Sequence, residues 1–260
     1  MALGLFLAPS PTLGQETDAE WLEDCDAHHG RRDRREVHCE VRPVEVASTG
    51  ALRVEGGNGP IRVNGGGVRA VEMRARVQAY GSSEAEAREA ARSVRIVVDG
   101  NRVRAEAPRD VHYSVGFIAR VPAAYDLDFD IANGPLVVED VRGRIVIDAQ
   151  NGPTDLRRVG GSIQAHSANG PLTVDVVSGT LGDFDLQTAN GPLTLLLPAD
   201  VNARLHARSG NGPLSTSGLN VRVERPRYGP GGSIDATLGT GGPTIRAHAS
   251  NGPLSIRADD

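Results

Sequence analysis

Apolar and polar residues alternate along most of this chain, and one recurring tripeptide interrupts the alternation. Leu127–Ile131 carries apolar side chains at every second position, and so does Leu136–Val138, which follows an Asn-Gly-Pro. A period of two is typical of β-strands with one buried face. We therefore expect a strand on each side of every Asn-Gly-Pro, with Ile147 and Val174 among the buried residues and Arg157 in solvent.

The tripeptide predicts a repeat architecture. It occurs seven times, beginning at Asn58, Asn133, Asn151, Asn169, Asn190, Asn211 and Asn251. From Asn133 to Asn211 successive copies are 18, 18, 21 and 21 residues apart. A period of this size indicates stacked, near-identical units. A degenerate copy, Gly241-Gly242-Pro243, lies between the last two copies.

The proline of the tripeptide decides between two β folds. Asn-Gly alone favours a two-residue hairpin. The proline, however, has no N–H to donate back across such a turn, and it is tolerated at the first residue of a strand. We interpret the tripeptide as the corner of an all-β, single-stranded β-helix-like β-solenoid, made of stacked 18–21-residue coils with one inserted α-helix. Stacking would align the corner asparagines in a hydrogen-bonded ladder. An antiparallel β-sandwich with wider turns is the alternative.

The repeat is interrupted between the first two copies. Ser83 and Glu86 have the spacing of a capping box and predict a helix that ends near Val94, followed by a hairpin around residues 99–101. The chain is thereby divided into a truncated signal peptide at 1–15, a Cys-containing segment at 16–46, a β layer with the inserted helix capping the solenoid at 47–122, and the solenoid repeats at 123–260.

Composition narrows the partners and the compartment. The net charge is −5, no lysine is present, arginines are dispersed and aromatic residues are few, so nothing indicates nucleic-acid binding. No apolar run is long enough to cross a membrane. Met1–Gln15 resembles the later part of a secretory signal, although a basic start is missing. These features predict an exported protein, whether periplasmic, exposed on the outer surface or secreted.

The chain contains two cysteines, Cys25 and Cys39. In an exported chain they favour a disulfide that closes a short loop. Together with His28, His29 and His38 they offer a zinc site as an alternative, but their spacing matches no usual zinc pattern. Free thiols are the third possibility. We expect the disulfide and no metal.

One candidate site emerges from stacking the coils. Asp130, Asp148 and His166 each lie three residues before a corner, and Gln187 and Arg208 continue the column. Two carboxylates and a histidine one coil apart have the chemistry to bind a cation or to transfer protons. The alternative is a solvated polar face. Conventional catalytic motifs are missing. We therefore expect no catalytic residues and no cofactor.

Several segments together resemble a known family. Cys25 precedes Cys39-Glu40-Val41-Arg42, an inserted helix begins with Ser83–Arg88, Asn-Gly corners recur, and Leu238–Pro243 precedes the final repeat. In this order they resemble the bacterial "putative adhesin" domain family over roughly Val44–Arg257. Relatives often carry Asn-Gly-Gly or Asn-Gly-Asp corners, so the proline is a departure. The resemblance implies a β-solenoid of envelope or secreted proteins and brings no catalytic residues with it.

The expected function is therefore that of a non-catalytic, adhesin-like binding or structural protein of the cell envelope. Its partner, a surface, a glycan or a protein, and its oligomeric state stay open at this point. A sensory or scaffolding module of an envelope-stress pathway is one alternative. A carbohydrate-active enzyme that uses the Asp130 column is the other.

Overall fold

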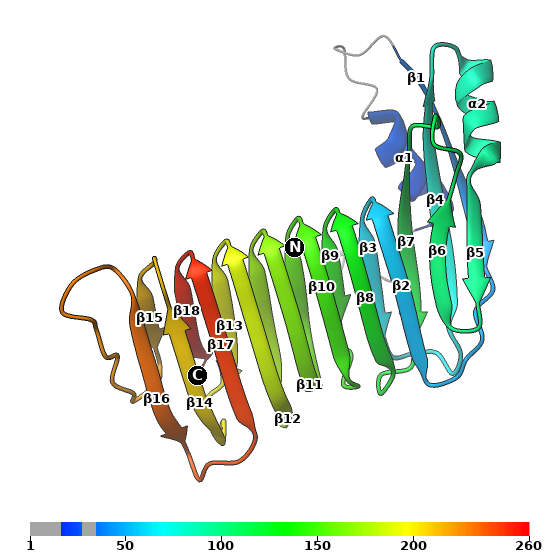
Figure 1. Cartoon of the computed structure of the whole chain (residues 1–260). Helices are drawn as coiled ribbons and strands as arrows, with labels where there is room; N and C mark the ends of the chain where they lie inside the picture. Colours follow the sequence, from blue (N-terminus) through cyan, green and yellow to red (C-terminus); the bar gives the residue numbers. More distant parts are fainter. Residues whose placement is uncertain (1–16, 28–34, 260) are drawn as a thin grey trace, which may run out of the picture.

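The computed structural model describes residues 17–27 and 35–259, and this part of the chain is almost entirely β (Figure 1). Within it, 18 strands join one mixed sheet. The two helices described are α1 (Asp18–Ala27) and α2 (Glu84–Ser93). The expected all-β class with an inserted helix is confirmed. The predicted signal segment at 1–15 lies outside the described residues.

The strands that lead into the corners form one parallel row. In spatial order the row is β2 (Ala51–Asn58), β8 (Asp126–Asn133), β10 (Ile145–Asn151), β11 (Thr154–Asn169), β12 (Leu172–Asn190), β17 (Thr244–Asn251) and β14 (Ala203–Ser209). Asn133 pairs with Asn58 on one side and with Asn151 on the other, and Asn151 pairs with Asn169. The predicted parallel register of equivalent residues is confirmed.

The strands that leave the corners form a second parallel row. It contains β3 (Ile61–Gly65), β9 (Leu136–Glu139), the first parts of β11 and β12, β13 (Leu193–Pro198), β18 (Leu254–Asp259) and β15 (Leu214–Ser217). β8 pairs with β2 and β10, whereas β9 pairs with β3 and β11. The two flanks of a corner therefore belong to different rows rather than to one hairpin.

Antiparallel strands cover the two ends of the rows. At the N-terminal end β1 (Glu36–Val44), β4 (Glu72–Gly81) and β7 (Tyr113–Val121) pair in that order, and β7 lies parallel to β3. The predicted hairpin is present as β5 (Arg95–Asp99) and β6 (Arg102–Glu106), with β6 against β2. At the other end β16 (Gly232–Leu238) pairs antiparallel with β14. Figure 1 shows the β1–β4–β7 layer rising beyond the stacked rows.

The inserted helix α2 begins where the sequence predicts. Ser83 is its N-cap and accepts a hydrogen bond from the Glu86 N–H at 3.3 Å. The carboxylate of Glu86 reaches back to the N–H of Ser82 at 2.9 Å, one residue earlier than in a standard capping box. Val94 is the C-cap, which confirms the predicted end of the helix.

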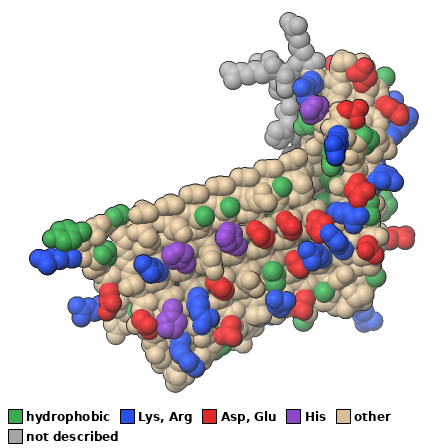
Figure 2. All heavy atoms as spheres, viewed as in Figure 1, with side chains coloured by type: hydrophobic (Ala, Val, Ile, Leu, Met, Phe, Trp, Pro, Cys, Tyr) green, Lys and Arg blue, Asp and Glu red, His purple; other side chains and the backbone are tan. Residues whose placement is uncertain are grey.

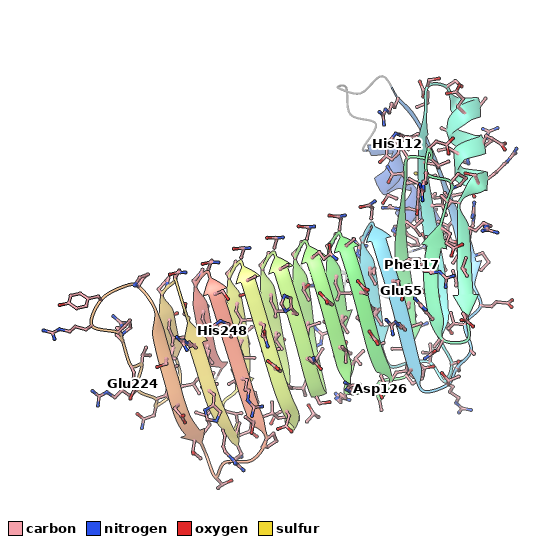
Figure 3. All side chains as sticks on the ribbon, viewed as in Figure 1. Glu55, His112, Phe117, Asp126, Glu224 and His248 are labelled. Atoms are coloured by element: carbon pink, nitrogen blue, oxygen red, sulfur yellow. The ribbon has the colours of Figure 1, made fainter. Side chains whose placement is uncertain are left out.

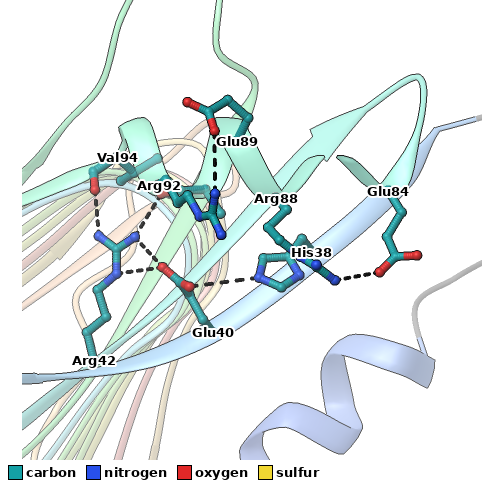
Figure 4. Close-up of polar contacts among 9 residues, drawn as sticks. His38, Glu40, Arg42, Glu84, Arg88, Glu89, Arg92 and Val94 are labelled. Atoms are coloured by element: carbon teal, nitrogen blue, oxygen red, sulfur yellow. Dashed lines mark hydrogen bonds and ion pairs between the residues drawn. The ribbon is translucent and has the colours of Figure 1, made fainter. Parts of the chain in front are cut away.

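A side chain from β1 fastens the other end of α2. The guanidinium of Arg42 donates to the carbonyls of Val94 and Ala91 at 2.5 and 2.8 Å, and to Glu40 beside it (Figure 4). The last carbonyls of a helix lack partners within the helix, and a cation is favourable there. Glu40 and Arg42 belong to the segment that carries the family resemblance, and these contacts give that segment a structural role.

The Asn-Gly-Pro corner satisfies its backbone without any N–H from proline. The N–H of Gly134 donates to the Asn151 carbonyl, and the N–H of Leu136 donates to the Pro153 carbonyl, both at 2.9 Å. A Cβ at Gly152 would lie 2.3 Å from the carbonyl oxygen of Gly134, and its φ is 125°. Only glycine lets successive corners approach this closely. The proline directly precedes a strand, where its missing donor costs nothing.

The corner asparagines form the expected ladder. The Nδ2 of Asn151 donates to the Oδ1 of Asn133 at 3.0 Å, and Asn169 donates to Asn151 at 3.1 Å. The same bond links the remaining members at 2.8–3.1 Å, in the order Asn58, Asn133, Asn151, Asn169, Asn190, Asn251 and Asn211. Each interior asparagine is therefore both a donor and an acceptor.

The inward positions of both rows build one core. Ile147 is 3% exposed and Val174 is fully buried, so the inward assignment from the alternation is confirmed. Phe117, Phe129 and Phe184 are among the largest side chains that are almost completely buried. Arg157 lies at the surface as expected, but it also pairs with the buried carboxylate of Glu139 at 3.1 Å.

The spatial order of the last coils differs from their order in the sequence. β17 lies between β12 and β14, so Asn251 is inserted between Asn190 and Asn211 in the ladder. The degenerate Gly241-Gly242-Pro243 forms the turn between β16 and β17 and contributes no corner to the ladder. The chain passes outward to β14, reverses in β16 and returns beside β12.

Candidate binding surface

One column of side chains runs along the outer face of the stack. The residue three positions before each corner asparagine points outward, and the strand register places these residues side by side. In spatial order the column is Glu55, Asp130, Asp148, His166, Gln187, His248 and Arg208. Figure 3 labels Glu55 and His248 toward its two ends, and Figure 2 shows acidic and histidine side chains in a row on this face.

The three residues singled out from the sequence are neighbours in this column. Asp148 pairs in register with Asp130 on one side and with His166 on the other, and all three are exposed. Among the described residues, no group of three or more His, Cys, Asp or Glu side chains is placed to hold a metal ion. The structure therefore adds no support to cation binding by this column, which the sequence left open beside the alternative of a solvated polar face.

The N-terminal end of the column is neutralised by arginines. The carboxylate of Glu55 lies 2.5 Å from Arg102 and 3.5 Å from Arg53. Arg53 also lies 3.7 Å from Asp128. Ion pairs at such exposed sites are worth no more than about 1 kcal/mol each. These arginines neutralise the charge of Glu55, so the negative charge of the column comes mainly from Asp130 and Asp148.

Charge changes sign along the stack. Residues 123–155 contain seven acidic residues and two arginines, whereas residues 201–257 contain seven arginines and two acidic residues. In the second region His206 also faces Asp235, with Nδ1 3.2 Å from its carboxylate. The net charge of the whole chain, −5, does not show this difference between the two segments. An extended surface with one anionic and one cationic end steers a charged partner toward a particular end.

A network of charges lies on the other side of the coils, at the corner opposite to Asn-Gly-Pro. The buried carboxylate of Glu139 faces Arg157 at 3.1 Å and Arg158 at 3.6 Å. Arg158 donates two hydrogen bonds, of 2.8 and 2.7 Å, to the carboxylate of Asp140. The bonds to Asp140 raise the pKa of Arg158, so it stays charged at any working pH. This cluster is internally paired and offers no open position for a ligand.

The cysteines lie on two neighbouring elements. Cys25 belongs to α1 and Cys39 to β1, and α1 packs against β1 and β4. Trp21 on α1 is 1% exposed and lies beneath the guanidinium of Arg76, 5.3 Å from the ring centre. The side chain of Cys25, with His28 and His29, lies outside the described residues. The disulfide therefore stays a prediction.

The sequence analysis did not identify two residues of the column, and it did not identify one groove. Glu55 and His248 obey the same rule as Asp130, since each lies three residues before a corner asparagine. Applying the rule to Asn58 and Asn251 would have found them. A groove at the C-terminal end, between β14 and the loop after β15, has no signal in the repeat because the loop that forms its other wall lies outside the regular coils.

Among the comparisons with known proteins, only solved structures match this chain. No protein-family model matches this chain, and no curated protein does. A solved structure of a "putative cell adhesion protein" from Clostridium sporogenes matches 86% of this chain and 100% of its own, with 11% identity and a TM-score of 0.47. A "putative adhesin" from Bacteroides fragilis matches 85% and 97%, with 11% identity and a TM-score of 0.30.

A third solved structure carries a different name. It is a "Putative lipid binding protein" from Parabacteroides distasonis, which matches 86% of this chain and 97% of its own, with 6% identity and a TM-score of 0.34. The two adhesin names agree with the family that the sequence motifs resemble. With every TM-score below 0.5, none of these structures establishes what this chain binds.

Proposed function

We propose that this chain is a non-catalytic, adhesin-like binding protein of the bacterial cell envelope, built as a β-solenoid. One observation carries the proposal: an outward face runs through seven stacked coils, with Asp130 and Asp148 toward one end of its column and Arg208 at the other. Such a face is rigid, because every strand in it is hydrogen-bonded to its neighbours. A rigid, charged and extended surface suits recognition of an extended partner.

The solenoid reading is supported by the pairing of the strands. Equivalent residues of successive coils pair in parallel, and both flanks of each corner do so in separate rows. An antiparallel sandwich would instead join neighbouring strands by hairpins. Antiparallel pairs are confined to the two ends, at β1–β4–β7 with β5–β6 and at β14–β16.

The absence of catalysis is proposed from the use of the side chains. Inward positions pack the core, and outward ones carry varied polar groups. The strongest candidate for chemistry is the pair Asp130 and Asp148, one coil apart, beside His166. A polysaccharide hydrolase or lyase would use two such carboxylates. A screen on polysaccharides should show no turnover. Activity that Asp148→Asn abolished at an unchanged melting temperature would replace the binding proposal with the enzymatic one.

Export is part of the proposal. No helix among the described residues is long and apolar enough to span a bilayer. Cys25 and Cys39 on adjacent elements are compatible with a disulfide formed outside the cytoplasm. Mass spectrometry of unreduced protein expressed in a periplasm should find the two cysteines linked. Free thiols or stoichiometric zinc would contradict the disulfide.

The binding function is tested by capture from the native envelope. Purified, tagged protein is incubated with envelope and cytosolic fractions of the source bacterium, and the retained material is analysed for both protein and carbohydrate. We expect specific retention of an envelope component that is competed by untagged protein. Retention of cytosolic material alone, or of nothing, would contradict the proposal. A retained signalling protein would favour the envelope-stress module instead.

A further inference from the structure

The C-terminal end of the stack contains a groove that the regular coils do not explain. It has a volume of about 390 Å³ and lies between β14 and the loop of residues 218–231. Arg208 and Arg225 line it from these two elements, and Glu224 is the only acidic residue among the described ones that line it. The groove is partly open to solvent. Small-molecule sites usually enclose most of their ligand, so this shape suits a polymer that passes through.

The loop that forms one wall of the groove is held in place by backbone contacts. Glu224 and Ser233 exchange two hydrogen bonds of 2.8 Å, which fix the loop against β16. A Cβ at Gly231 would lie 2.5 Å from the carbonyl oxygen of Gly210, so the loop also closes tightly on the corner. The wall is therefore preorganised, which reduces the entropy lost on binding. Figure 3 labels Glu224 on this loop.

The chemistry of the loop is basic and aromatic. Arg222, Arg225 and Arg227 are exposed, and the guanidinium of Arg227 lies 5.7 Å from the ring centre of Tyr228. Tyr228 is 82% exposed, the highest value among the exposed large hydrophobic side chains of the described residues. Guanidinium groups bind carboxylates in a bidentate manner. An exposed tyrosine offers an apolar face to the C–H side of a sugar ring and a hydroxyl to its polar groups.

We infer that this groove binds an acidic polysaccharide, with Arg208 and Arg225 holding uronate carboxylates and Tyr228, which is on the same loop outside the groove lining, contacting a sugar ring beyond it. The inference rests on the proposed binding function and names the ligand class for one end of the stack. Arg204 of β14 and Arg246 of β17 point outward on the same face beyond the groove, and Arg246 lies beside Asp185 of β12. A charged polymer longer than the groove gains from each of these contacts, whereas a single sugar does not.

Binding of polygalacturonate to the full chain, measured by calorimetry at low and at physiological ionic strength, tests the inference. Dextran serves as the neutral polysaccharide and poly-L-glutamate as the carboxylate polymer without sugar. We expect polygalacturonate to bind, more weakly as salt rises, and dextran not to bind. Arg208→Gln/Arg225→Gln should weaken binding at least about tenfold. Arg88→Gln/Arg92→Gln removes the same charge from α2 and should change it less than about twofold.

Tyr228→Ala separates sugar recognition from general attraction of polyanions. It should weaken polygalacturonate binding without affecting poly-L-glutamate binding. Slower hydrogen exchange in residues 218–233 with polygalacturonate would place the ligand in the groove, even if a double variant failed to fold. No binding of polygalacturonate, equal losses in the two double variants, or poly-L-glutamate binding as tightly as polygalacturonate would overturn the inference. If envelope capture succeeded while polygalacturonate failed, only the ligand class would fall.

Discussion

Each coil turns twice, and the two turns follow different rules. At the Asn-Gly-Pro corner the register between neighbouring coils is unbroken up to the asparagine, as for Asn151 and Asn169. At the opposite corner the register between β11 and β12 shifts three times between Leu156 and Ile163. The Asn-Gly-Pro corner therefore keeps the same register in successive coils, whereas the opposite corner changes from one coil to the next.

The difference explains why the repeat length changes. Leu156 pairs with Val174, 18 residues later, whereas Ile163 pairs with Phe184, 21 residues later. The three additional residues are thus taken up entirely within the opposite corner. Close glycine-to-carbonyl contacts occur at both corners, at Gly152 and at Gly161, so they do not by themselves explain why the length changes at only one of them. Asp140 and Arg158 have positive φ values of 59° and 49° at the opposite corner, so even residues other than glycine adopt turn conformations there.

The largest expected effect compares glycines of the two corners. Gly152→Ala drives a methyl group to 2.3 Å from a carbonyl oxygen of the next coil at a φ of 125°. We expect it to lower the free energy of unfolding by about 3 kcal/mol or more, from overpacking plus backbone strain. Gly179→Ala at the opposite corner meets nothing within 4 Å at a φ of 72° and should cost about 1 kcal/mol.

Urea denaturation of both variants measures the two costs. Equal losses would mean that close packing of the corners is not what requires glycine. A Gly152→Ala variant as stable as the original would show that the corner can open without disturbing its neighbours.

The strands between the corners give the second comparison. Ile147 is 3% exposed in the core, and Ile147→Ala should cost about 2–5 kcal/mol through lost burial and a cavity. Val174→Ala should cost somewhat less. Arg246 points outward from β17, and Arg246→Ala should stay within about 0.5 kcal/mol. Thermal melting distinguishes them, and similar shifts for Ile147 and Arg246 would contradict the inward assignment.

Arg157 is exposed but is not a suitable control for the outward positions. Its guanidinium is one of the two that face the buried carboxylate of Glu139, so Arg157→Ala removes a partner from a buried charge. Its cost should fall between those of Arg246→Ala and Ile147→Ala, because Arg158 remains to face Glu139. The sequence showed that Arg157 is outward but did not show the neighbour it pairs with.

The asparagine ladder predicts a difference between its middle and its end. Asn151 donates to Asn133 and accepts from Asn169, whereas Asn58 only accepts from Asn133 within the ladder. Asn151→Ala should cost about 1–2 kcal/mol and Asn58→Ala about half of that, at about 1 kcal/mol per hydrogen bond. Denaturant unfolding of the two variants provides the measurement. Equal costs would mean that the side-chain bonds contribute nothing beyond the glycine contacts.

Much of the stacked region could be predicted from the sequence because the same interactions recur in each coil. The spacing of the tripeptide gives the register, and alternation gives the inward residues such as Ile147. The insertion of β17 between β12 and β14 was not predictable, because Asn251 and Asn211 carry the same corner and either fits beside Asn190. The order is decided by how β14, β16 and β17 connect at the end of the stack. Likewise, the groove beside residues 218–231 depends on a loop without any periodic signal.

The smallest expected effect lies at the variable corner. Asp140 binds Arg158 through two hydrogen bonds, but its side chain is 38% exposed and that of Arg158 is 52% exposed. Asp140→Asn removes the charge while keeping a residue that tolerates a φ of 59°. Because solvent screens such pairs, the loss should be about 0.5 kcal/mol. It should disappear in about 1 M NaCl, where the screening length is shorter than the stacking distance of the coils. Urea denaturation at both salt concentrations measures it. A loss above about 2 kcal/mol that persisted at high salt would show that this corner is held as strictly as Asn-Gly-Pro, and the contrast between the two turns would then rest on length alone.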